Sequence, residues 1–346
     1  MTRVIREAIA AEGPLPFERF MALALYGEGG YFAAHTLRSV SSGDFLTSPE
    51  LSPLFGETLA ELVGREQARI GEPFALVEVA AGSGSLLRPL LRARPVEAWA
   101  VELSPAARAA LAELVGAERV VGSLEQIPGP LRGVILANEL VDNLPMALAR
   151  REAAGWVEQW VDREGDGLVF VDAPARPEVE QWLERFAGPV PPGGQVEVQL
   201  AAAAWLRAAL GRLEAGAIVL FDYGDTAEGL ARRRPEGTLR TYRDHHLGPP
   251  PLDEPGATDI TADVDFGALQ TIAREAGARA ELWRQDELLE ALGLRERVAR
   301  LHRRERELAR GGDPEERASL RALREGAETL LHPRGLGDFR VLVARV

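Results

Sequence analysis

A regular alternation of apolar strands and amphipathic helices between residues 75 and 137 constrains the fold of this chain more than any other feature. The expected strands are residues 75–79, 98–102, 119–121 and 133–137, and the expected helices are residues 86–92 and 105–115. Strands that alternate with helices in this order form a parallel sheet with helices on both faces. The sequence therefore predicts an α/β fold organised around a parallel sheet.

The segments on either side of this alternation predict further strands and several additions to the sheet. They are an amphipathic segment at 1–13, helices at 16–26 and 53–70, a hairpin of strands at 156–161 and 168–171, a helix at 201–213, a strand at 217–221, a helix at 265–276 capped by Asp265, charged helices within 286–331 and a strand at 338–346. Together the strands predict a seven-stranded, mostly parallel, Rossmann-like sheet with an antiparallel last strand.

We expect this chain to have two parts. The first is an N-terminal helical segment with a covering loop at residues 1–72. The second is a Rossmann-like domain at residues 73–346, with insertions at about 150–200 and 224–265 and a helical region at about 286–331. The segment at 224–265 has little periodicity, and long irregular connections of this kind are usually functional or disordered.

Composition narrows the classes of function. The 346 residues carry 40 basic side chains, all of them arginine, against 53 acidic ones, a formal net charge of −13. This balance disfavours nucleic acid and anionic membranes as partners. Cysteine is absent, which excludes disulfides, thiolate metal ligands and cysteine nucleophiles. The sequence shows neither a secretory signal nor an apolar run of about 20 residues, so we expect a cytoplasmic protein.

A glycine turn follows the strand at 75–79 and indicates a nucleotide-like cofactor. Gly82 and Gly84 lack a Cβ atom, so a ligand can approach the backbone closely there. Glu102 ends the next strand about 20 residues later, where a carboxylate can accept both hydroxyls of a ribose. A dinucleotide site needs a small residue near position 87, which here is Leu87. The turn therefore favours S-adenosylmethionine (SAM), with Glu78 near its methionine end.

Polar side chains at two more strand ends are expected to contact the ligands. Ser123 and Leu124 follow the third strand, where a small polar group and an apolar wall can hold adenine. Asn138, Glu139 and Asp142 leave the fourth strand, and ligands bind beyond such strand ends. If the methyl acceptor is an arginine, the two carboxylates can grip its guanidinium and the amide can orient the reacting nitrogen. Capping of a helix explains Asp142 equally well.

Other polar clusters have simpler explanations. His245 and the neighbouring His246 are candidates to accept a proton from the methylated nitrogen, but surface histidines are the favoured interpretation. The acidic residues at positions 259, 263 and 265 fit no known oxygen-ligand loop, so we expect no metal. The stretch at 295–310 interleaves Arg with Glu, as in a solvated helix face with internal ion pairs, and it requires no partner.

Several segments together resemble the MidA-like methyltransferase family, whose mitochondrial member is an assembly factor for respiratory complex I. They are Tyr26-Gly27-Glu28-Gly29-Gly30-Tyr31-Phe32, Gly43-Asp44-Phe45-Leu46-Thr47-Ser48-Pro49-Glu50, Phe55-Gly56-Glu57, Asn138-Glu139 through Pro145, Phe221-Asp222-Tyr223-Gly224, Gly237-Thr238-Leu239-Arg240-Thr241-Tyr242, Asp259-Ile260-Thr261 and Val264-Asp265-Phe266. The similarity spans nearly the whole chain in order.

This resemblance implies a class I, SAM-dependent protein arginine methyltransferase with a protein substrate. It places Thr47, Ser48 and Pro49 near the cofactor, in a loop over the glycine turn. Tyr223, Tyr242 and His245 are candidates for the acceptor side from their positions in the sequence, and filling of the sheet end explains Tyr223 as well. The family usually has glycine where this chain has Ala80, and we expect Ala80 to allow close approach if its φ is negative. The family often has histidine at the position of Asp263, so no role is inferred there.

Two alternatives remain open from the sequence. The same scaffold can methylate a small molecule, which a cleft too narrow for a peptide would favour. It can also serve as a non-catalytic assembly chaperone, because the glycine expected at position 80 is lost. A nicotinamide-dependent oxidoreductase is disfavoured by Leu87. The acceptor, the methylation pattern and the oligomeric state are not encoded in any motif.

Overall fold

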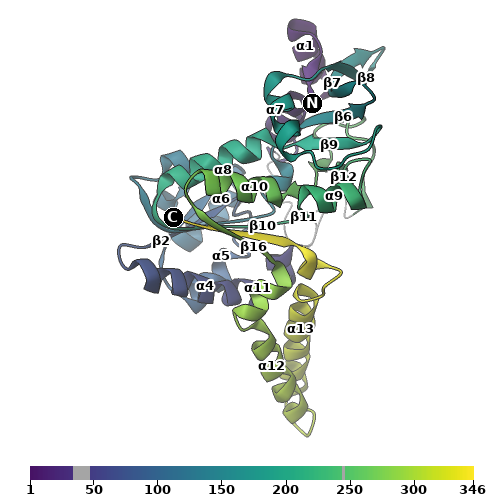
Figure 1. Ribbon diagram of the computed structural model, residues 1–346. Coiled ribbons are helices and arrows are strands. Elements are labelled where there is room, and N and C mark those ends of the chain that lie inside the picture. The colour runs from purple at the N-terminus through teal and green to yellow at the C-terminus, as the bar shows by residue number, and fades with distance from the viewer. Residues whose placement is uncertain (34–46, 244–245) are drawn as a thin grey trace. The chain divides into compact units, whose positions relative to one another are not determined.

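The computed structural model describes residues 1–33, 47–243 and 246–346 (Figure 1). The chain forms two compact units, each assembled from three stretches of sequence. Unit 1 comprises residues 1–45, 139–210 and 222–278, and unit 2 comprises residues 46–138, 211–221 and 279–346. The chain therefore passes between the units several times rather than at one linker. The expected division at residue 72 stays a prediction.

Unit 2 contains a seven-stranded sheet in the order β16-β17-β10-β5-β2-β3-β4. Its strands are β2 (Ala75–Val79), β3 (Glu97–Val101), β4 (Val120–Val121), β5 (Leu131–Asn138), β10 (Leu213–Asp222), β16 (Arg279–Arg284) and β17 (Arg340–Arg345). The five strands from β10 to β4 pair in parallel, whereas β16 and β17 are antiparallel. Gly216 and Val346 exchange both backbone hydrogen bonds, as antiparallel neighbours do. The predicted α/β fold with seven strands is confirmed.

Helices cover this sheet because its strands are apolar on both faces. β2 has the sequence ALVEV, and four of its five residues are buried. Unit 2 contains the helices α3 (Ser48–Leu51), α4 (Leu54–Ile70), α5 (Leu87–Ala93), α6 (Pro105–Val115), α11 (Gln285–Ala291), α12 (Leu294–Leu308) and α13 (Pro314–Leu330), with 3-10 turns η1 (Ala117–Arg119), η2 (Leu124–Gln126) and η4 (Leu336–Asp338). Phe55 on α4 lies edge-on to Phe221 on β10, at 5.2 Å between ring centroids. Continuous burial of this kind is typical of parallel sheets.

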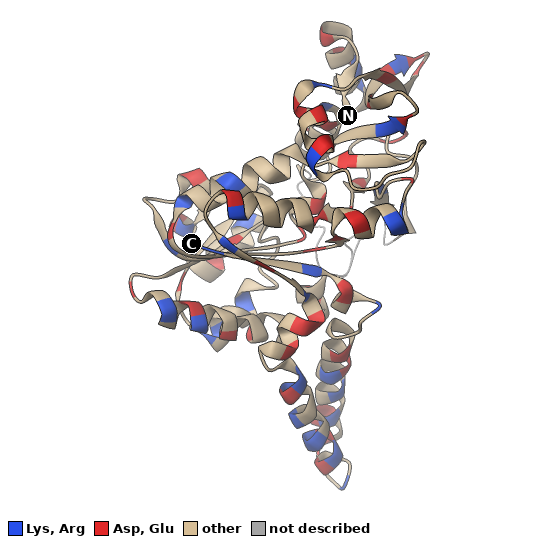
Figure 2. Ribbon diagram, viewed as in Figure 1, with Lys and Arg blue, Asp and Glu red and all other residues tan. Residues whose placement is uncertain are grey.

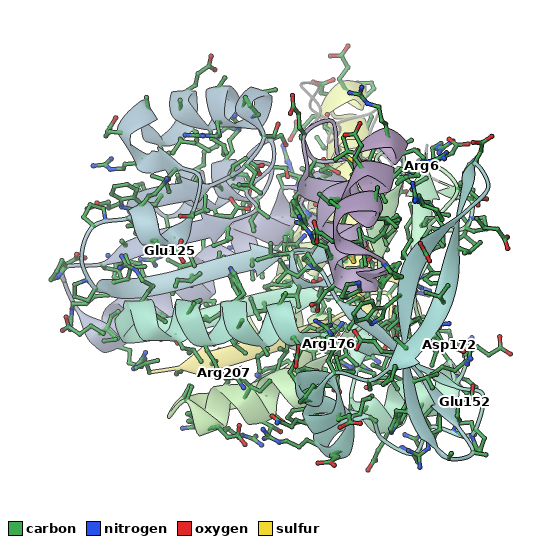
Figure 3. All side chains as sticks on the ribbon, turned by 90° about the horizontal axis from the view of Figure 1, so that it is seen from above. Arg6, Glu125, Glu152, Asp172, Arg176 and Arg207 are labelled. Atoms are coloured by element: carbon green, nitrogen blue, oxygen red, sulfur yellow. The ribbon has the colours of Figure 1, made fainter. Side chains whose placement is uncertain are left out.

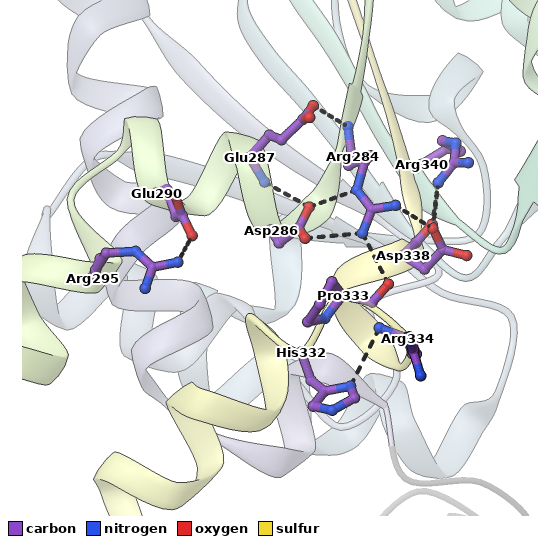
Figure 4. A network of polar contacts seen from close by, with 10 residues as sticks. All are labelled: Arg284, Asp286, Glu287, Glu290, Arg295, His332, Pro333, Arg334, Asp338 and Arg340. Atoms are coloured by element: carbon purple, nitrogen blue, oxygen red, sulfur yellow. Dashed lines mark hydrogen bonds and ion pairs between the residues drawn. The ribbon is translucent and has the colours of Figure 1, made fainter.

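A cluster of charged side chains joins α11, η4 and the two late strands of unit 2 (Figure 4). The Arg284 guanidinium donates to both oxygens of Asp286, at 3.0 and 2.9 Å, and to Asp338 at 2.6 Å. It also donates to the backbone oxygen of Pro333 at 3.0 Å. Arg340 bonds the same Asp338 carboxylate. One guanidinium therefore fixes the end of β16 against the turn that precedes β17.

Unit 1 is built on a second, antiparallel sheet in the order β1-β7-β6-β9, with β8 paired to β7. Its strands are β1 (Leu15–Pro16), β6 (Ala147–Glu152), β7 (Gly155–Glu164), β8 (Gly167–Pro174) and β9 (Gln195–Val198). The expected hairpin is found as β7 and β8, longer than predicted. β6 was not predicted because its sequence, ALARRE, has small apolar residues followed by arginines and no clear alternation. Its burial comes from pairing with β7 and β9.

The segment expected to be irregular between residues 224 and 265 contains short paired elements. They are β11 (Gly224–Asp225), α9 (Ala227–Arg233), β12 (Arg240–Arg243), β13 (His246–Leu247), β14 (Asp259–Thr261) and β15 (Val264–Asp265). β12 pairs with β13 and β14, and β11 pairs with β15. The remaining elements of unit 1 are α1 (Thr2–Glu12), α2 (Phe17–Tyr26), η3 (Val141–Asn143), α7 (Pro177–Phe186), α8 (Leu200–Arg212, whose last two residues fall in unit 2) and α10 (Phe266–Glu275). Asp265 caps α10 by accepting the N–H of Ala268 at 3.0 Å, as predicted.

A buried ion pair ties α7 to the antiparallel sheet. Glu158 on β7 has no solvent exposure, and the Arg176 guanidinium lies 2.8 Å from its carboxylate. Arg176, labelled in Figure 3, also contacts Glu18 on α2 at 2.8 Å. By contrast, Arg150 forms exposed ion pairs with Glu152 and Asp172, two residues that are labelled in Figure 3.

These two pairs give a matched test. Replacing Arg176 with Ala leaves the Glu158 carboxylate buried without its cation, and we expect the free energy of unfolding to fall by about 3 kcal/mol. Arg150→Ala removes an exposed pair and should cost below about 1 kcal/mol. Urea unfolding of the two variants checks this, and equal losses would contradict the role assigned to Arg176.

Candidate functional site

The turn after β2 has three residues in the left-handed backbone region. The φ angles of Ala80, Gly82 and Gly84 are 56°, 51° and 77°. The expectation of a negative φ at Ala80 is therefore wrong. The turn leaves β2 in a left-handed conformation at its first residue, whichever side chain stands there. A side chain in this region costs about 1 kcal/mol, which explains why glycine is the usual residue at this position of the resembled family.

Glu102 lies beside this turn. Its Oε2 accepts the N–H of Gly82 at 2.8 Å, and its Oε1 accepts the N–H of Ser104 at 2.8 Å. A carboxylate has about four acceptor positions, so further hydroxyl donors can still bind. The structure thus brings together the predicted glycine turn and the predicted ribose acceptor, both within unit 2.

Glu78 on β2 is a buried acid next to the same turn. It is 4 % exposed, and among the described residues its Oε2 has no hydrogen-bond partner. Burial, and secondly the negative charge of Glu102, raise the pKa of Glu78 well above its ordinary value of 4.5. A buried carboxylate with an open acceptor is suited to a cationic ligand. SAM carries both an ammonium and a sulfonium group, so Glu78, Glu102 and the glycine turn fit this cofactor.

The predicted adenine segment forms a small closed loop. Leu124 is 6 % exposed on η2, and the N–H of Gly122 donates to Gln126 at 2.7 Å. The Ser123 hydroxyl bonds Glu125 and is the main cause of the lowered pKa of that carboxyl. Glu125 is labelled in Figure 3. The roles of Ser123 and Leu124 toward adenine stay predictions.

The predicted covering segment at 47–49 begins a helix rather than an open loop. Thr47 caps α3 in a reciprocal arrangement with Glu50. Ser48 is fully buried, and its hydroxyl lies 3.3 Å from the Gln285 side chain on α11. Pro49 is buried as well. The described contacts of these residues are therefore with other helices of unit 2, and their place over the glycine turn stays a prediction.

The segment leaving β5 carries the predicted acceptor residues, and it is held by Asp222. Asp222 is fully buried, and its Oδ2 accepts the N–H groups of Val141 and Asp142 at 2.9 and 3.1 Å. Burial, followed by the charges of Asp142 and Glu139, raises the pKa of Asp222 well above its ordinary value. Glu139 has a φ of 51°, which is strained for this residue type. Strain of this kind clusters at functional sites.

Two side-chain hydrogen bonds orient the carboxylates of this segment. The Tyr223 hydroxyl donates to Glu139 Oε2 at 2.8 Å, and the Thr261 hydroxyl donates to Asp142 Oδ2 at 2.6 Å. Asp142 is 3 % exposed, and its Oδ1 has no hydrogen-bond partner among the described residues. Burial raises the pKa of Asp142, and the bond from Thr261 opposes part of this rise. Unit 1 therefore presents a buried carboxylate with one free acceptor oxygen.

Asn143 has a structural role beside Asp142. Its amide donates to Asp259 Oδ1 at 2.8 Å and to the backbone oxygen of Ile260 at 3.0 Å. Its own backbone oxygen accepts the hydroxyl of Tyr26 at 3.1 Å. These contacts explain two motifs of the resembled family, the one at residues 26–32 and the one at 259–261, because both hold the segment that follows β5.

The other predicted acceptor residues are less tightly grouped. Tyr242 lies on β12, where it pairs with Asp259 on β14. Asp263 forms an ion pair with Arg240, whose positive charge opposes part of the rise in the pKa of Asp142. His245 lies outside the described residues. Within the described parts of the chain, no group of His, Asp and Glu side chains is arranged to hold a metal ion, and no helix is long and apolar enough to cross a membrane.

Sequence reasoning did not identify the roles of Asp222 and Thr261 around Asp142. The signal for Asp222 is its place directly after the apolar run of β10, next in line to β5 in the sheet. In the register of these strands Phe221 pairs with Asn138, so the residue after each strand emerges at the same edge. No local pattern marks Thr261, which reaches Asp142 from 119 positions away.

The glycine turn, the carboxylate bonded to it and the parallel sheet with an antiparallel last strand define a SAM-dependent methyltransferase. The chain belongs to the family described as "Putative S-adenosyl-L-methionine-dependent methyltransferase", whose model matches residues 55–283. SAM is accordingly its cofactor, and it is an enzyme of the transferase class.

Known relatives agree with this assignment. Protein arginine methyltransferase NDUFAF7, mitochondrial, of Rattus norvegicus is 28% identical, with 98% of this chain and 82% of the relative covered. The Homo sapiens protein of the same name is 27% identical, with 98% and 81% covered. A crystal structure from Burkholderia thailandensis, bound to S-adenosyl-homocysteine, is 29% identical with a TM-score of 0.85, and covers 100% of this chain and 91% of that one.

The comparisons also correct one expectation. A cytoplasmic location was expected from the sequence, but the relatives from rat, human and Drosophila melanogaster are all named as mitochondrial proteins. The cytoplasmic prediction is therefore wrong. The prediction was based on the lack of a secretory signal and of an apolar run of about 20 residues. Neither feature separates cytoplasmic from mitochondrial proteins.

The backbone strain at Ala80 predicts the direction in which a substitution there changes the free energy of unfolding. Ala80→Gly removes a left-handed cost of about 1 kcal/mol, and glycine's extra unfolded-state entropy offsets about half of it. The variant should be equally or slightly more stable. Ala81→Gly, one position on and outside the left-handed region, should destabilise by about 1 kcal/mol. Chemical denaturation of both variants measures this, and a loss of stability in Ala80→Gly would contradict it.

The buried acid of β2 predicts opposite effects on stability and on cofactor binding. Because the pKa of Glu78 is higher in the folded chain, the unfolded chain loses this proton first. The free energy of unfolding should therefore fall as pH rises above 4.5, through the raised pKa. Glu78→Gln should remove that fall and stabilise the ligand-free protein at neutral pH. It should also weaken SAM binding about tenfold, since a neutral amide attracts the cation less.

Thermal unfolding across pH and titration calorimetry with SAM provide the two measurements. Glu97→Gln, at an exposed position on β3, is the control and should change neither quantity. A Glu78→Gln variant that binds SAM as tightly as the unmodified protein would remove Glu78 from the cofactor site.

Proposed function

We propose that this chain transfers a methyl group from SAM to the guanidinium of an arginine in a protein substrate. Two lines of support converge. The relatives from rat and human are named protein arginine methyltransferases. Independently, unit 1 carries a buried carboxylate, Asp142, in the segment that follows β5, and a guanidinium is the side-chain cation that remains charged at any physiological pH.

The observation that carries the proposal is the open oxygen of Asp142. The Asp142 carboxylate is 3 % exposed, and among the described residues its Oδ1 has no hydrogen-bond partner. A buried acceptor of this kind destabilises the folded protein unless a ligand donates a hydrogen bond to it. A guanidinium offers planar N–H groups that can bond two carboxylates at once. In the proposal, Asp142 and Glu139 bind the acceptor arginine, and Asn138 orients the reacting nitrogen.

Proton balance assigns a second task to Asp142. SAM supplies an electrophilic methyl carbon, whose bond to sulfur breaks with both electrons going to sulfur as the nitrogen bonds the carbon. The protonated guanidinium must lose one N–H proton in this exchange, because the methylated product carries the same single charge. A general base works best when its pKa is close to the working pH. Burial raises the pKa of Asp142 in that direction, so Asp142 is the proposed proton acceptor.

Tyr223 and Asp222 are proposed as positioning residues. Asp222 accepts two consecutive backbone N–H groups, so it fixes the path of the chain at Val141 and Asp142. Tyr223 fixes the Glu139 carboxylate by a hydrogen bond of 2.8 Å. Asp222 and Tyr223 are consecutive residues at the end of β10. This one strand end therefore orients Asp142 and Glu139, the two carboxylates proposed to bind the acceptor arginine. Tyr242 and His245 stay as candidates for contacts with the substrate chain.

The remaining predicted residues are proposed for the cofactor. Glu102 binds the ribose and Glu78 the methionine end. Gly82 and Gly84, which lack a Cβ, allow the close approach, and Ala80 lies in the same turn. The pair at 123–124 is proposed for adenine, and the segment at 47–49 for covering the turn. The partner is a protein, with no part for nucleic acid or membrane.

Methyl incorporation from radiolabelled SAM into an arginine-containing peptide library tests this function directly. Asp142→Asn should lower kcat by about a hundredfold, because it removes the general base, while SAM affinity by calorimetry stays unchanged. In the unmodified protein kcat should rise with pH through the raised pKa of Asp142, since only the deprotonated form accepts a proton. The variant should lose this pH dependence.

Tyr223→Phe separates positioning from folding. It removes one hydroxyl, so the melting temperature should change little, while the KM for the peptide should rise about tenfold. The control is Tyr31→Phe, which removes the hydroxyl of another buried tyrosine, in the turn after α2. No role in acceptor binding is proposed for Tyr31, so its KM for the peptide should stay unchanged. Methylation of the library that is confined to lysine or absent, with SAM bound normally, would overturn the arginine proposal.

A further inference from the structure

A pair of charged helices at the C-terminal side of unit 2 forms a feature that the methyltransferase site does not use. α12 and α13, joined by residues 309–313, are called the arginine arm here. The two helices run side by side in Figure 1. At the base of the arm, Leu294, Ala327 and Leu330 belong to the apolar core of unit 2. The arm is therefore anchored at one end, while the connecting residues are exposed.

A polar clasp holds the two helices together farther from the base. The Glu305 carboxylate on α12 accepts bonds from Arg321 and Arg324 on α13, both at 3.0 Å. These bonds lower the pKa of Glu305. Arg304 reaches Glu316 at 3.0 Å across the same seam. The ion pairs predicted for this stretch are thus present on the side of α12 that faces α13.

The arm differs in charge from the rest of the protein. Residues 294–330 contain 10 Arg against 8 Asp and Glu, whereas the whole chain contains 40 basic against 53 acidic residues. In the ribbon of Figure 2, basic positions, coloured blue, recur along both helices of the arm, with acidic positions in red between them. The arm is therefore a local positive region on a strongly acidic protein.

Three arginines on α12 and one in the turn that follows it are exposed and lack ion pairs. In the part of the chain that the structure describes, none of Arg300, Arg303, Arg306 and Arg310 forms an ion pair. Arg300, Arg303 and Arg306 are three residues apart, which places them on one face of the helix, and Arg310 lies just beyond its last residue, Leu308. That face is turned away from the seam, because Leu294, Leu301 and Leu308 repeat every seven residues on the other side.

The outer arginines lie close to one another. Like charges three or four positions apart on a helix repel and destabilise it. Five of the other six arginines of α12 and α13 form ion pairs; they are Arg295, Arg297, Arg304, Arg321 and Arg324. Among the described residues the outer face has no such ion pairs, so a molecule that brings carboxylates to it would relieve this repulsion.

We infer that the outer face of α12, formed by Arg300, Arg303 and Arg306 and extended by Arg310 in the following turn, binds an acidic segment of a partner protein. Guanidinium groups match carboxylates in bidentate geometry. The face offers no aromatic side chain on which a base can stack, as single-stranded nucleic acid requires. It offers no large apolar side chain for insertion into a membrane. A long polyanion would extend beyond the arm and be repelled by the net charge of −13 on the whole protein. A short acidic segment can contact the arm alone.

The binding of a fluorescein-labelled poly-glutamate peptide at low salt tests this inference. The full-length protein should bind the peptide, and raising the salt concentration should weaken binding. The variant with Arg300, Arg303, Arg306 and Arg310 replaced by Glu should bind about tenfold or more weakly. Arg and Glu have similar helix propensity, so the arm should stay folded, which circular dichroism verifies.

Two controls make the outcome specific. A variant with the same change of charge elsewhere, at the exposed and unpaired Arg88, Arg92, Arg163 and Arg207, should bind the peptide like the unmodified protein. Replacing the four arm arginines with Lys should keep part of the affinity, because charge is kept and the fork geometry is lost.

Equal weakening by both sets of Glu substitutions, or no peptide binding at all, would overturn the inference. So would tighter binding of a single-stranded RNA of matched charge, or of phosphatidylserine vesicles, than of the peptide. The inference does not rest on arginine methylation. SAM binding by calorimetry, measured on the same variants, should stay unchanged, so a failure of the arm and a failure of the proposed function give different results.

Discussion

The buried carboxylate of Asp222 is the constraint on which the acceptor side of this protein depends. It stands at the end of β10 and holds two backbone N–H groups of the segment that leaves β5. Without an acceptor there, those two donors would be buried and unsatisfied, which costs about 1–3 kcal/mol each. The register of the parallel sheet brings the two strand ends together. The position of Glu139 and Asp142 is thus a consequence of sheet geometry and one side chain.

Several residues that carry the family resemblance hold the chain in place around the candidate site. Tyr26, Asp259 and Ile260 all hold Asn143. In unit 2, Gly56 lies so close to the backbone oxygen of Leu86 that a Cβ would stand 2.6 Å from it. Family motifs that are read as binding residues therefore include many that fix the turns next to the binding residues.

The parallel sheet could be predicted from the sequence, because its strands are short apolar runs separated by segments with helical periodicity. The turn at 80–84 and Glu102 could be found for the same reason, since both directly follow such strands. The antiparallel sheet of unit 1 was largely missed, because the burial of β6 comes from β7 and β9 rather than from its own pattern. The conformation of Ala80 could not be predicted, because backbone shape at a turn is imposed by the strands on either side.

Contacts between distant residues were beyond sequence reasoning for a related reason. Thr261 bonds Asp142, yet the two residues are 119 positions apart, and threonine has many other uses in a strand. The same holds for the division of the arginines on α12 into paired and unpaired faces. Alternating Arg and Glu in a sequence predicts ion pairs, but only the packing of α13 decides which face receives them.

Buried acids with an open oxygen occur in both units, at Glu78 and at Asp142. A protein selected for stability alone would replace them with neutral side chains, because burial raises the pKa of each and so weakens the fold at neutral pH. Their retention is explained if each receives positive charge from a ligand during turnover. The proposed methyl transfer from a sulfonium to a guanidinium involves two cations, and in that proposal Glu78 receives the first and Asp142 the second. The net charge of −13 acts in the same direction, since it lowers the repulsion that two approaching cations would otherwise meet.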